Sequence, residues 1–551
     1  MALSGFMEQI YQGRFDWELF QVALPATESD RVARLIEAYR ELVKAYPPAV
    51  IEEAGRIPPE MLKKMGEQGF FGLTVPEAYG GQGLHLADCM RVVETVAPID
   101  LSVALVFLAH LFIGIKGIEL YGTEDQKQRY LTLAASGKMI FSYALTEPLT
   151  GSDARHIETR ADLTPDGSYY ILNGTKTYIT NANYAGGLTV FAQLDPAKPG
   201  HMGAFIVETA WEGVQVGPDM AKMGLKASST ATIRLKDVRV PRENLLGPAG
   251  EGFKIALTVL HYGRMGLGAA SRGVMAQSVQ DMRERAASRR QFGQPIIHFP
   301  LIREKIGKAA VHTFVMGAMN DFAAGLLEKN PEETVIETSH CKLFGTTRAW
   351  DALYDALQVC GGAGYLATQP FEKRMRDFRV TTIFEGTTEI HSIYPALLGM
   401  KQLGDEVKKR TGLTRWLFLG KSLLNSLGNA GWPGASEDPL QKRAFREAKR
   451  LARMLRRRIL MGVIIYGKTL VNREFLLRRI TVLSLYLFGI LSILAKLERD
   501  RQTGVMDSHD RKGLVWFLGE AAAAGKDHGR FRDSRMEKTL IGPDLVSGNE
   551  T

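Results

Sequence analysis

The hydrophobic period of the sequence changes twice, and these changes limit the folds the chain can adopt. Residues 1–140 carry apolar side chains mostly at helical spacing, as in "SDRVARLIEAYRELVKAY". From 141 to 245, alternating runs such as "LTVFAQL" and "GAFIVE" predict β-strands. Long helical patterns return over 246–405. With 551 residues, the chain is too long for one core. We therefore predict an α+β multidomain protein with an N-terminal helical domain, a small central β domain and a helical bundle.

One β segment carries a turn signal. In "YYILNGTKTYIT" two alternating runs flank Asn173-Gly174, a dipeptide typical of two-residue hairpin loops. The sequence predicts a hairpin at this point.

Residues 406–551 are expected to form a fourth, helical domain. The stretch 425–439, "NSLGNAGWPGASEDP", is rich in Gly, Pro, Ser and Asn and is interpreted as a linker. A basic helical region follows to about residue 500, and the last forty residues are polar and expected to be weakly ordered.

Positive charge is concentrated in one part of this domain. The net charge is +9, but residues 441–480 alone carry +11, so the rest of the chain is close to neutral. In "KRAFREAKRLARMLRRRIL" five apolar residues share one helical face and basic residues fill the other, a pattern typical of helices at a membrane surface. Those five are Phe445, Ala448, Ala452, Leu455 and Ile459. The open alternative is a helix packed on its own domain with a solvated basic face. No nucleic-acid-binding fold is recognisable, so no nucleic acid partner is expected.

Several classes of protein have little support. The three cysteines lack paired spacing, which argues against a disulfide framework or a zinc ribbon. No P-loop, H-E-x-x-H or C-x-x-C motif occurs, and we expect no metal site. The start of the sequence lacks a secretory or transit pattern, which favours a cytoplasmic protein, in part held at the inner face of the cytoplasmic membrane. The apolar run 480–495 is shorter than the roughly 20 residues of a spanning helix, which favours a buried or interfacial helix.

A single carboxylate stands in an apolar strip. In "RVTTIFEGTTEIH" Glu385 follows β-branched and aromatic residues and precedes Gly386. Such neighbours would desolvate the carboxylate and raise its pKa, which suits a general base. The glycine would allow a substrate to approach the backbone closely. Local sequence leaves an alternative open, a surface or N-cap carboxylate at a helix start.

Six stretches in order extend the interpretation. They are "FSYALTEPLTGSDARHIETRA" (141–161), "LNGTKTYITNA" (172–182), "KMGLKASSTATIRLKDVRVPRENLLG" (222–247), "SRRQFGQPI" (288–296), "QVCGGAGY" (358–365) and "MRDFRVTTIFEGTTEI" (375–390). Together they resemble the acyl-CoA dehydrogenase family over about residues 30–405, and the very-long-chain branch most. The resemblance implies FAD as cofactor, an acyl-CoA substrate, trans-2-enoyl-CoA as product in fatty acid β-oxidation, an electron transfer flavoprotein as acceptor and at least a homodimer.

The resemblance also implies roles for individual residues. Glu385 matches the glutamate that removes the α proton. The cofactor-binding positions are Tyr143, Ala144, Leu145, Thr146, Ser152, Tyr178, Ile179, Thr180, Arg289, Gln291, Phe292, Gln358, Gly361, Gly362, Thr387, Thr388 and Glu389. Of these, Gln358, Gly361 and Gly362 match a neighbouring subunit's contribution. The substrate-binding positions are Ser152, Gly263, Arg264, Phe384 and Gly386.

Gly263 decides between two family variants. A second variant places the base on the long helix just before an arginine, and here Gly263 precedes Arg264. Glycine cannot act as a base, so that variant is excluded, and the glycine leaves space for an acyl chain. The loop "TEPLTGSD" departs from the family, because Leu149 and Thr150 stand where small residues are commoner.

Two rival functions stay open. A related flavin acyl-CoA oxidase would pass electrons to oxygen instead of to a flavoprotein. An assembly or scaffold protein could also use this fold, with catalysis secondary.

Overall fold

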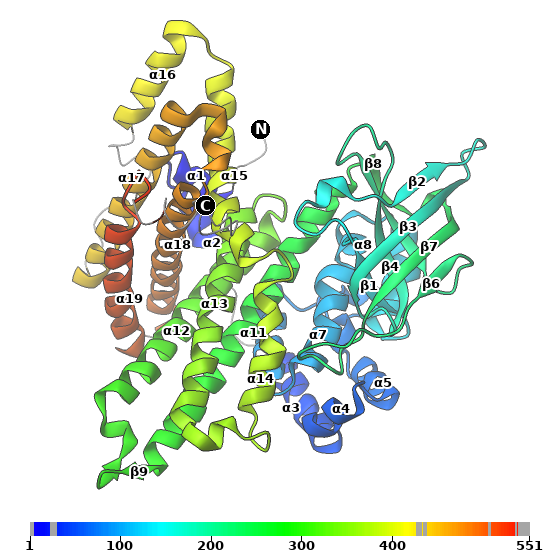
Figure 1. Ribbon diagram of the computed structural model, residues 1–551, viewed down its shortest axis with the longest axis horizontal. Coiled ribbons are helices and arrows are strands. Elements are labelled where there is room, and N and C mark those ends of the chain that lie inside the picture. Colours follow the sequence, from blue (N-terminus) through cyan, green and yellow to red (C-terminus); the bar gives the residue numbers. More distant parts are fainter. Residues whose placement is uncertain are drawn as a thin grey trace, which may run out of the picture.

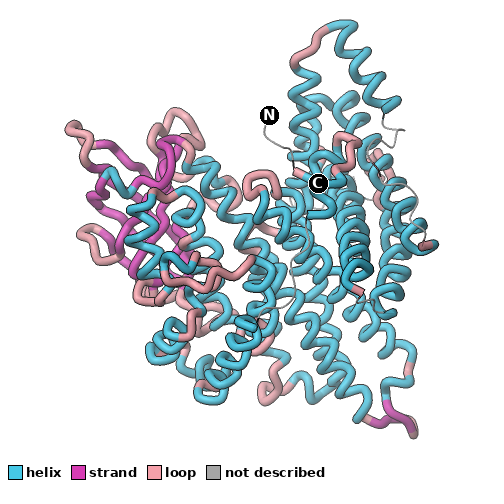
Figure 2. The backbone as a smooth tube through the Cα atoms, turned by 180° about the vertical axis from the view of Figure 1, so that it is seen from behind, coloured by secondary structure: helices cyan, strands magenta, loops and turns pink. Residues whose placement is uncertain are grey.

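The computed structural model describes residues 5–22, 30–425, 432, 438–504, 508–534 and 537. The strands of the central sheet gather at one side of the molecule, and apart from a short hairpin at the far end of the bundle helices make up the rest, as Figures 1 and 2 show. Buried apolar side chains form two clusters, one within the β domain and one that runs continuously through the helical parts.

The N-terminal helical region lies against the sheet and the bundle. Its larger helices are α3 (Asp30–Ala45), α4 (Pro48–Ala54), α5 (Pro59–Glu67), α6 (Leu86–Val96), α7 (Leu101–Leu108) and α8 (Lys116–Tyr121). The short α9 (Glu124–Gln126) and α10 (Thr132–Ala135) follow. Between α7 and α8 the chain makes a π-helical turn, η3 (Ala109–Gly114). Such turns are rare and are frequent at functional sites.

The first two helices pack elsewhere. Helices α1 (Phe6–Tyr11) and α2 (Trp17–Val22) lie on the bundle and the C-terminal helices (Figure 1). The Phe6 ring meets Phe322 edge-on with centroids 5.2 Å apart, and the Met7 N–H donates to the buried Glu337 carboxylate at 2.7 Å. The N-terminal segment therefore joins parts of the chain that are far apart in sequence.

The central domain is a mixed eight-stranded sheet in the order β6-β7-β3-β2-β4-β5-β8, with β1 added parallel to β4. Its strands are β1 (Ile140–Ala144), β2 (Arg160–Leu163), β3 (Tyr169–Thr180), β4 (Ala185–Gln193), β5 (Met202–Glu208), β6 (Val214–Val216), β7 (Thr230–Pro241) and β8 (Leu245–Gly250).

The predicted hairpin at Asn173-Gly174 is wrong. Residues Tyr169–Thr180 form one continuous strand, and the Asn-Gly pair marks a shift in its register with β7. The Asn173 side chain accepts from the Asp237 N–H at 2.8 Å and donates to the Asp237 carboxylate at 3.1 Å. These cross-strand bonds satisfy a bulge, which the same residue types favour as readily as a turn.

Long helices form the bundle. They are α11 (Gly252–Ser288), α12 (Pro300–Lys329), α13 (Val335–Cys360), α14 (Phe371–Phe378) and α15 (Thr388–Lys408). The β9–β10 hairpin (Arg290–Gln291, Gln294–Pro295) joins α11 to α12 at the end of the bundle away from the sheet (Figure 1). Pro300 at the first turn of α12 suits a helix start, where its missing N–H has no partner to lose.

The C-terminal helices are α16 (Gly412–Asn425), α17 (Pro439–Tyr466), α18 (Glu474–Thr503) and α19 (Ser508–Asp527). On α17, Ala448, Leu455 and Ile459 are buried in the shared core. The apolar face expected to meet a membrane is thus used for internal packing, which is the alternative left open by the sequence. The predicted linker lies largely outside the described residues.

The described part of the last forty residues contains a helix where weak order was expected. Helix α19 buries Leu514, Phe517, Leu518 and Ala521, which stand at helical spacing against α18 and α12. A polar average hid this narrow apolar stripe, because charged residues, alanine and glycine make up most of the rest of the helix.

Among the described residues, two helical stretches are long and apolar enough to cross a membrane, Leu101–Tyr121 and Glu474–Thr503. In these, 89% and 83% of the most apolar window is buried inside the protein. The second contains the run 480–495, which is therefore a core helix here.

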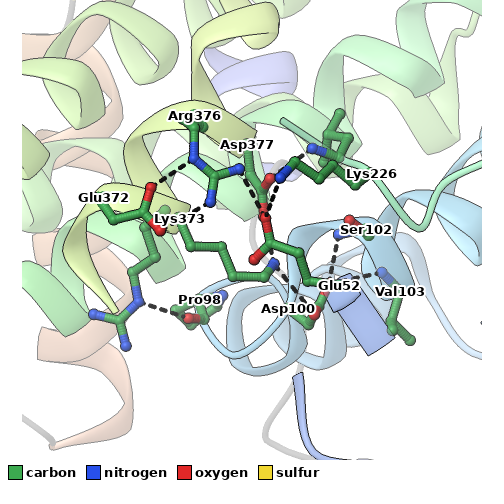
Figure 3. Close-up of polar contacts among 12 residues, drawn as sticks. Glu52, Pro98, Asp100, Ser102, Val103, Lys226, Glu372, Lys373, Arg376 and Asp377 are labelled. Atoms are coloured by element: carbon green, nitrogen blue, oxygen red, sulfur yellow. Dashed lines mark hydrogen bonds and ion pairs between the residues drawn. The ribbon is translucent and has the colours of Figure 1, made fainter. Parts of the chain in front are cut away.

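A charged junction joins the three domains just before the Glu385 loop (Figure 3). From α14, Lys373 pairs with Asp100 at 3.3 Å and with Asp377 at 2.6 Å. Arg376 pairs with Glu52 of α4 at 2.8 Å, and Asp377 accepts the backbone N–H of Leu225 from the β domain. Burial raises the pKa of Asp100 even though Lys373 opposes it. The junction fixes α14, which leads directly into the loop that carries Glu385.

Candidate active site

Glu385 lies on the short connection between η9 (Arg379–Thr382) and α15. Its backbone has a left-handed φ of +57°, which is uncommon for a residue with a side chain, and Gly386 follows at +96°. The residue is partly exposed, whereas its Oε2 atom is enclosed and has no hydrogen-bond partner among the described residues. A strained residue with an unsatisfied buried carboxylate oxygen points to a functional group.

The surroundings set its proton affinity. Burial raises the pKa of Glu385 from 4.5 to about 7, although the positive charges of Arg264 and Lys342 pull it down. Arg264 is itself buried on α11, and its Nε has no partner among the described residues. A carboxyl group with this pKa can accept a proton near neutral pH, as a general base must.

Gly263 faces this carboxylate directly. A Cβ atom at Gly263 would lie 2.8 Å from Glu385 Oε2 and 2.9 Å from Ile113 Cγ2. Ile113 belongs to the π-helical turn η3, so three elements meet here. Position 263 of α11 and the Glu385 side chain therefore lie next to the same small volume. A carboxylate from either position could reach it, which agrees with the two places that the family uses for its base.

The two β segments with predicted flavin contacts lie side by side. The Thr177 N–H donates to the Thr146 carbonyl at 2.9 Å, and Ser142 Oγ donates to the Thr180 carbonyl at 2.8 Å. Tyr143 reaches across to α11, where its hydroxyl donates to the Ala256 carbonyl at 3.1 Å. Burial raises the pKa of Tyr143, and the negative charge of Glu385 raises it further.

Tyr178 offers a surface for a flat ring. Its side chain is 68% exposed and its φ is +56°, so the strand turns the aromatic outward at the point where its register with β7 shifts. Ile179 beside it is buried and anchors the strand. An exposed aromatic next to the Thr146 segment fits an isoalloxazine ring at this end of β3.

A second predicted group lies far from the first. Arg289, Gln291 and Phe292 are at the β9 end of α11, and Phe292 is 93% exposed with a φ of +49°. From Gly263 to Arg289 the helix rises by about 39 Å. Within one chain these residues do not meet Glu385.

Another three predicted residues share that distal end. Gln358 is exposed on α13, and Gly361 and Gly362 are exposed with open space where a Cβ would stand. Arg285 of α11 donates to the Cys360 carbonyl at 3.4 Å and so connects the two distal segments.

The remaining predicted residues lie next to Glu385, at the start of α15 and in the loop after β1. Thr387 is the N-cap of α15, and its hydroxyl accepts the Ile390 N–H at 3.3 Å. Phe384 packs on the main core and Glu389 is exposed. Ser152 is exposed in the loop where Leu149 also points to solvent, so that unusual leucine obstructs nothing in the fold.

Three residues near the base escaped the sequence analysis: Ser339, Lys342 and His391. Lys342 Nζ donates to the Gly386 carbonyl at 2.6 Å, and His391 Nε2 lies 2.9 Å from the Glu385 carbonyl. A Cβ at Gly386 would stand 2.7 Å from His391 Nε2, so this glycine is needed for the turn itself. The only sequence signal for these residues was a lysine and a histidine on the apolar faces of helices. Sequence alone does not distinguish such residues from ordinary exposed charged residues.

Comparisons with known proteins agree with this geometry. Family models for the N-terminal, middle and C-terminal domains of acyl-CoA dehydrogenase match residues 29–138, 142–238 and 250–394. The mitochondrial very long-chain specific acyl-CoA dehydrogenase of Homo sapiens is 36% identical over 83% of this chain and 72% of its own length. That of Bos taurus is 35% identical over 85% of this chain and 74% of its own length.

Solved structures extend the likeness to the whole architecture. An acyl-CoA dehydrogenase from Bacillus anthracis, complexed with FAD, superimposes with a TM-score of 0.82 at 28% identity, over 100% of this chain and 96% of that one. Butyryl-CoA dehydrogenase from Megasphaera elsdenii gives a TM-score of 0.64 at 30% identity, over 68% of this chain and 100% of its own.

A helical–β–helical fold that matches all three family models, with an enclosed carboxylate on the turn before α15, defines a flavoprotein oxidoreductase that acts on CH–CH bonds. The chain belongs to the acyl-CoA dehydrogenase family. The predictions of family, fold class and enzyme class are thereby confirmed.

Proposed function

We propose that the protein desaturates a long-chain acyl-CoA to the trans-2-enoyl-CoA, with FAD as cofactor and an electron transfer flavoprotein as acceptor. The observation that carries this proposal is the enclosed Glu385 carboxylate, which meets α11 at a residue without a side chain. Chain length is inferred from the similarity to very long-chain specific enzymes, which extends beyond the three family domains into the C-terminal helices.

The residues of this chain divide the chemistry. Glu385 takes the proton from the α carbon, and the partly buried environment favours transfer because neither protonation state is strongly preferred near pH 7. Tyr143, Leu145, Thr146 and Tyr178–Thr180 hold the flavin ring at the ends of β1 and β3. Bound FAD supplies the acceptor for the β hydrogen, which leaves as hydride.

A homodimer would complete the cofactor site. The distal group of Arg289, Gln291 and Phe292 lies about 39 Å along α11 from Gly263, too far to contact the same flavin ring. A second copy that brings its own distal end, which also holds Gln358, Gly361 and Gly362, beside the Tyr143 and Tyr178 segments of the first copy would give both halves of a long dinucleotide a binding surface.

Anaerobic addition of palmitoyl-CoA to the purified holoprotein tests the reaction. We expect the flavin band near 450 nm to bleach within the mixing experiment, because hydride transfer reduces the flavin. Stoichiometric peroxide with product in air, without a flavoprotein acceptor, would favour the oxidase. A colourless protein that FAD cannot reconstitute would favour the scaffold role.

We also propose that the basic face of α17 holds the protein at an anionic membrane surface. Lys442, Arg443, Arg446, Arg453 and Arg457 are exposed on this helix while its apolar face is buried. Each basic residue near such a surface contributes about 1 kcal/mol. Helix α16 adds the exposed apolar side chains Leu413, Trp416 and Leu417.

Sedimentation with phosphatidylserine vesicles tests this proposal. We expect binding at low salt that is lost at high salt, and loss of binding in the triple variant Arg443→Glu/Arg446→Glu/Arg453→Glu. A matched variant with the same charge change elsewhere, Lys63→Glu/Lys138→Glu/Lys236→Glu, should still sediment. Equal binding by both variants would contradict the proposal.

A further inference from the structure

The turn that carries the base is held from behind by two side chains that donate to consecutive carbonyls. Lys342 Nζ donates to the Gly386 carbonyl at 2.6 Å, and His391 Nε2 donates to the Glu385 carbonyl at 2.9 Å. Lys342 comes from α13 and His391 from α15, so the two contacts reach the turn from different helices.

His391 is in turn oriented by Ser339. The Ser339 hydroxyl lies 2.6 Å from His391 Nδ1, and both residues are fully buried. Burial and nearby cations hold the pKa of His391 well below its usual range, so the ring is neutral and has one N–H. Since the Glu385 carbonyl can only accept, that hydrogen is on Nε2, and Ser339 donates to Nδ1.

Lys342 has no ion-pair partner of its own among the described residues. Its side chain is fully buried, and no carboxylate oxygen there lies within 4.0 Å of Nζ. Other buried lysines differ: Lys116 pairs with Glu119 and Lys176 pairs with Glu147. A buried ammonium is costly unless compensated. Its main compensation here is the Gly386 carbonyl together with the field of the nearby Glu385 carboxylate.

The held conformation is one that the chain would not keep unaided. Glu385 at φ +57° and Gly386 at φ +96° are both left-handed, and two successive left-handed residues require fixed partners. Helix α13 is itself fixed from its other side, since His340 Nε2 lies 2.8 Å from Ser484 Oγ of α18 in the C-terminal extension.

We propose that Lys342 and the Ser339–His391 pair are positioning residues for the Glu385 carboxylate: they lock the two carbonyls of its turn and so aim the base at the substrate carbon. This inference rests on the proposed function, because it assigns a role relative to that reaction. Burial, with the nearby charge of Arg264, lowers the pKa of Lys342 to about 7, and in its charged form Lys342 favours the ionised carboxylate.

Other charged and titratable groups act on Lys342 or Glu385 and are left unchanged in the variants described below. They are Arg264 from α11, Tyr143 from β1 and Glu389 from α15.

The experiment compares Lys342→Met, Ser339→Ala and His391→Leu with His391→Gln, which keeps an N–H donor. Thr338→Val is the matched control, because Thr338 is equally buried on α13 but its hydroxyl bonds only to carbonyls of its own helix, at 2.9 Å and 3.3 Å. Each holoprotein is mixed with palmitoyl-CoA without oxygen, and the flavin-reduction rate is recorded from pH 6 to 9. FAD content and Tm are measured alongside.

We expect Lys342→Met to lower the rate about 10- to 100-fold and to move the midpoint of the pH profile upward by about one unit, since a cation beside the base is lost. Ser339→Ala and His391→Leu should lower the rate without shifting the pH profile upward. His391→Gln should be faster than His391→Leu, because it keeps an N–H donor. Thr338→Val should match the wild type in both respects.

A second readout does not depend on turnover. An acyl-CoA with sulfur at the β position cannot lose hydride, so its α proton can only move to the base, and a long-wavelength band beside the flavin reports that transfer. The pH at which this band is half-formed should rise in Lys342→Met and stay unchanged in Thr338→Val.

Unchanged rates and pH profiles in Lys342→Met and His391→Leu would overturn the inference, as would rate losses that only follow lost FAD or Tm. If the wild type itself does not bleach with palmitoyl-CoA, the proposed function fails instead, and the two results cannot be confused.

Discussion

Replacing Glu385 with Gln should leave a yellow, folded protein whose flavin is reduced by palmitoyl-CoA roughly 10²- to 10⁴-fold more slowly. The amide keeps the size of the side chain and cannot accept the α proton, and a positioned general base contributes roughly 10²–10⁴-fold. The enclosed Oε2 has no hydrogen-bond partner to lose among the described residues, so folding and FAD content should be close to normal. Stopped-flow absorbance at 450 nm gives the rate, and turnover within tenfold of the wild type would remove Glu385 as the base.

The pH dependence provides an internal control for this prediction. Burial raises the pKa of Glu385 to about 7, and only the ionised form can take a proton. The wild-type rate should therefore rise as pH increases towards 7 and level off above it. The residual rate of Glu385→Gln should lack this rise, because the group that titrates has been removed.

Much of the fold followed from the sequence because its signals are local. The change from helical to alternating period at about residue 141 coincides with β1, which begins at Ile140. The hairpin predicted at Asn173-Gly174 is wrong because Asp237, in a strand far along the chain, bonds to Asn173 and makes the pair part of a bulge. The polar average of the last forty residues concealed α19, whose stripe is recognisable only once α18 is placed against it.

The sequence predicted those site residues that belong to a local motif. It did not predict those that reach the site through contacts between distant parts of the chain. Glu385 stood out because a carboxylate followed an apolar run, and the structure encloses its Oε2. Lys342 lies 43 residues earlier on another helix, and only the packing of α13 behind the turn shows that it meets Gly386. Long-range hydrogen bonds of this kind leave no periodic pattern in a sequence.

Gly263→Val should nearly abolish flavin reduction while the fold persists. The Cβ alone would stand 2.8 Å from Glu385 Oε2 and 2.9 Å from Ile113 Cγ2, distances that real Cβ atoms essentially never show. The carboxylate must move, and a displacement of about 1 Å from the reacting carbon can cost roughly 10²-fold in rate. Overpacking should also cost about 1–3 kcal/mol of stability, measured as a lower Tm.

A glycine without neighbours supplies the control. Gly307 lies within α12, and a Cβ there would meet nothing within 4 Å. Gly307→Ala should leave the rate unchanged and stabilise the helix by about 0.5–1 kcal/mol. A normal rate in Gly263→Val would mean that the carboxylate and α11 do not share the space the structure gives them.

The same closeness predicts that the base can be moved across the site. In Glu385→Gly/Gly263→Glu the left-handed position gains a residue suited to it, and a carboxylate on α11 reaches the volume that Oε2 occupies. We expect this double variant to reduce its flavin faster than Glu385→Gly alone, although more slowly than the wild type, because Lys342 and His391 hold the old turn and not the helix. A double variant no faster than Glu385→Gly would show that proton removal needs the direction set by the 385–386 turn as well as a carboxylate within reach.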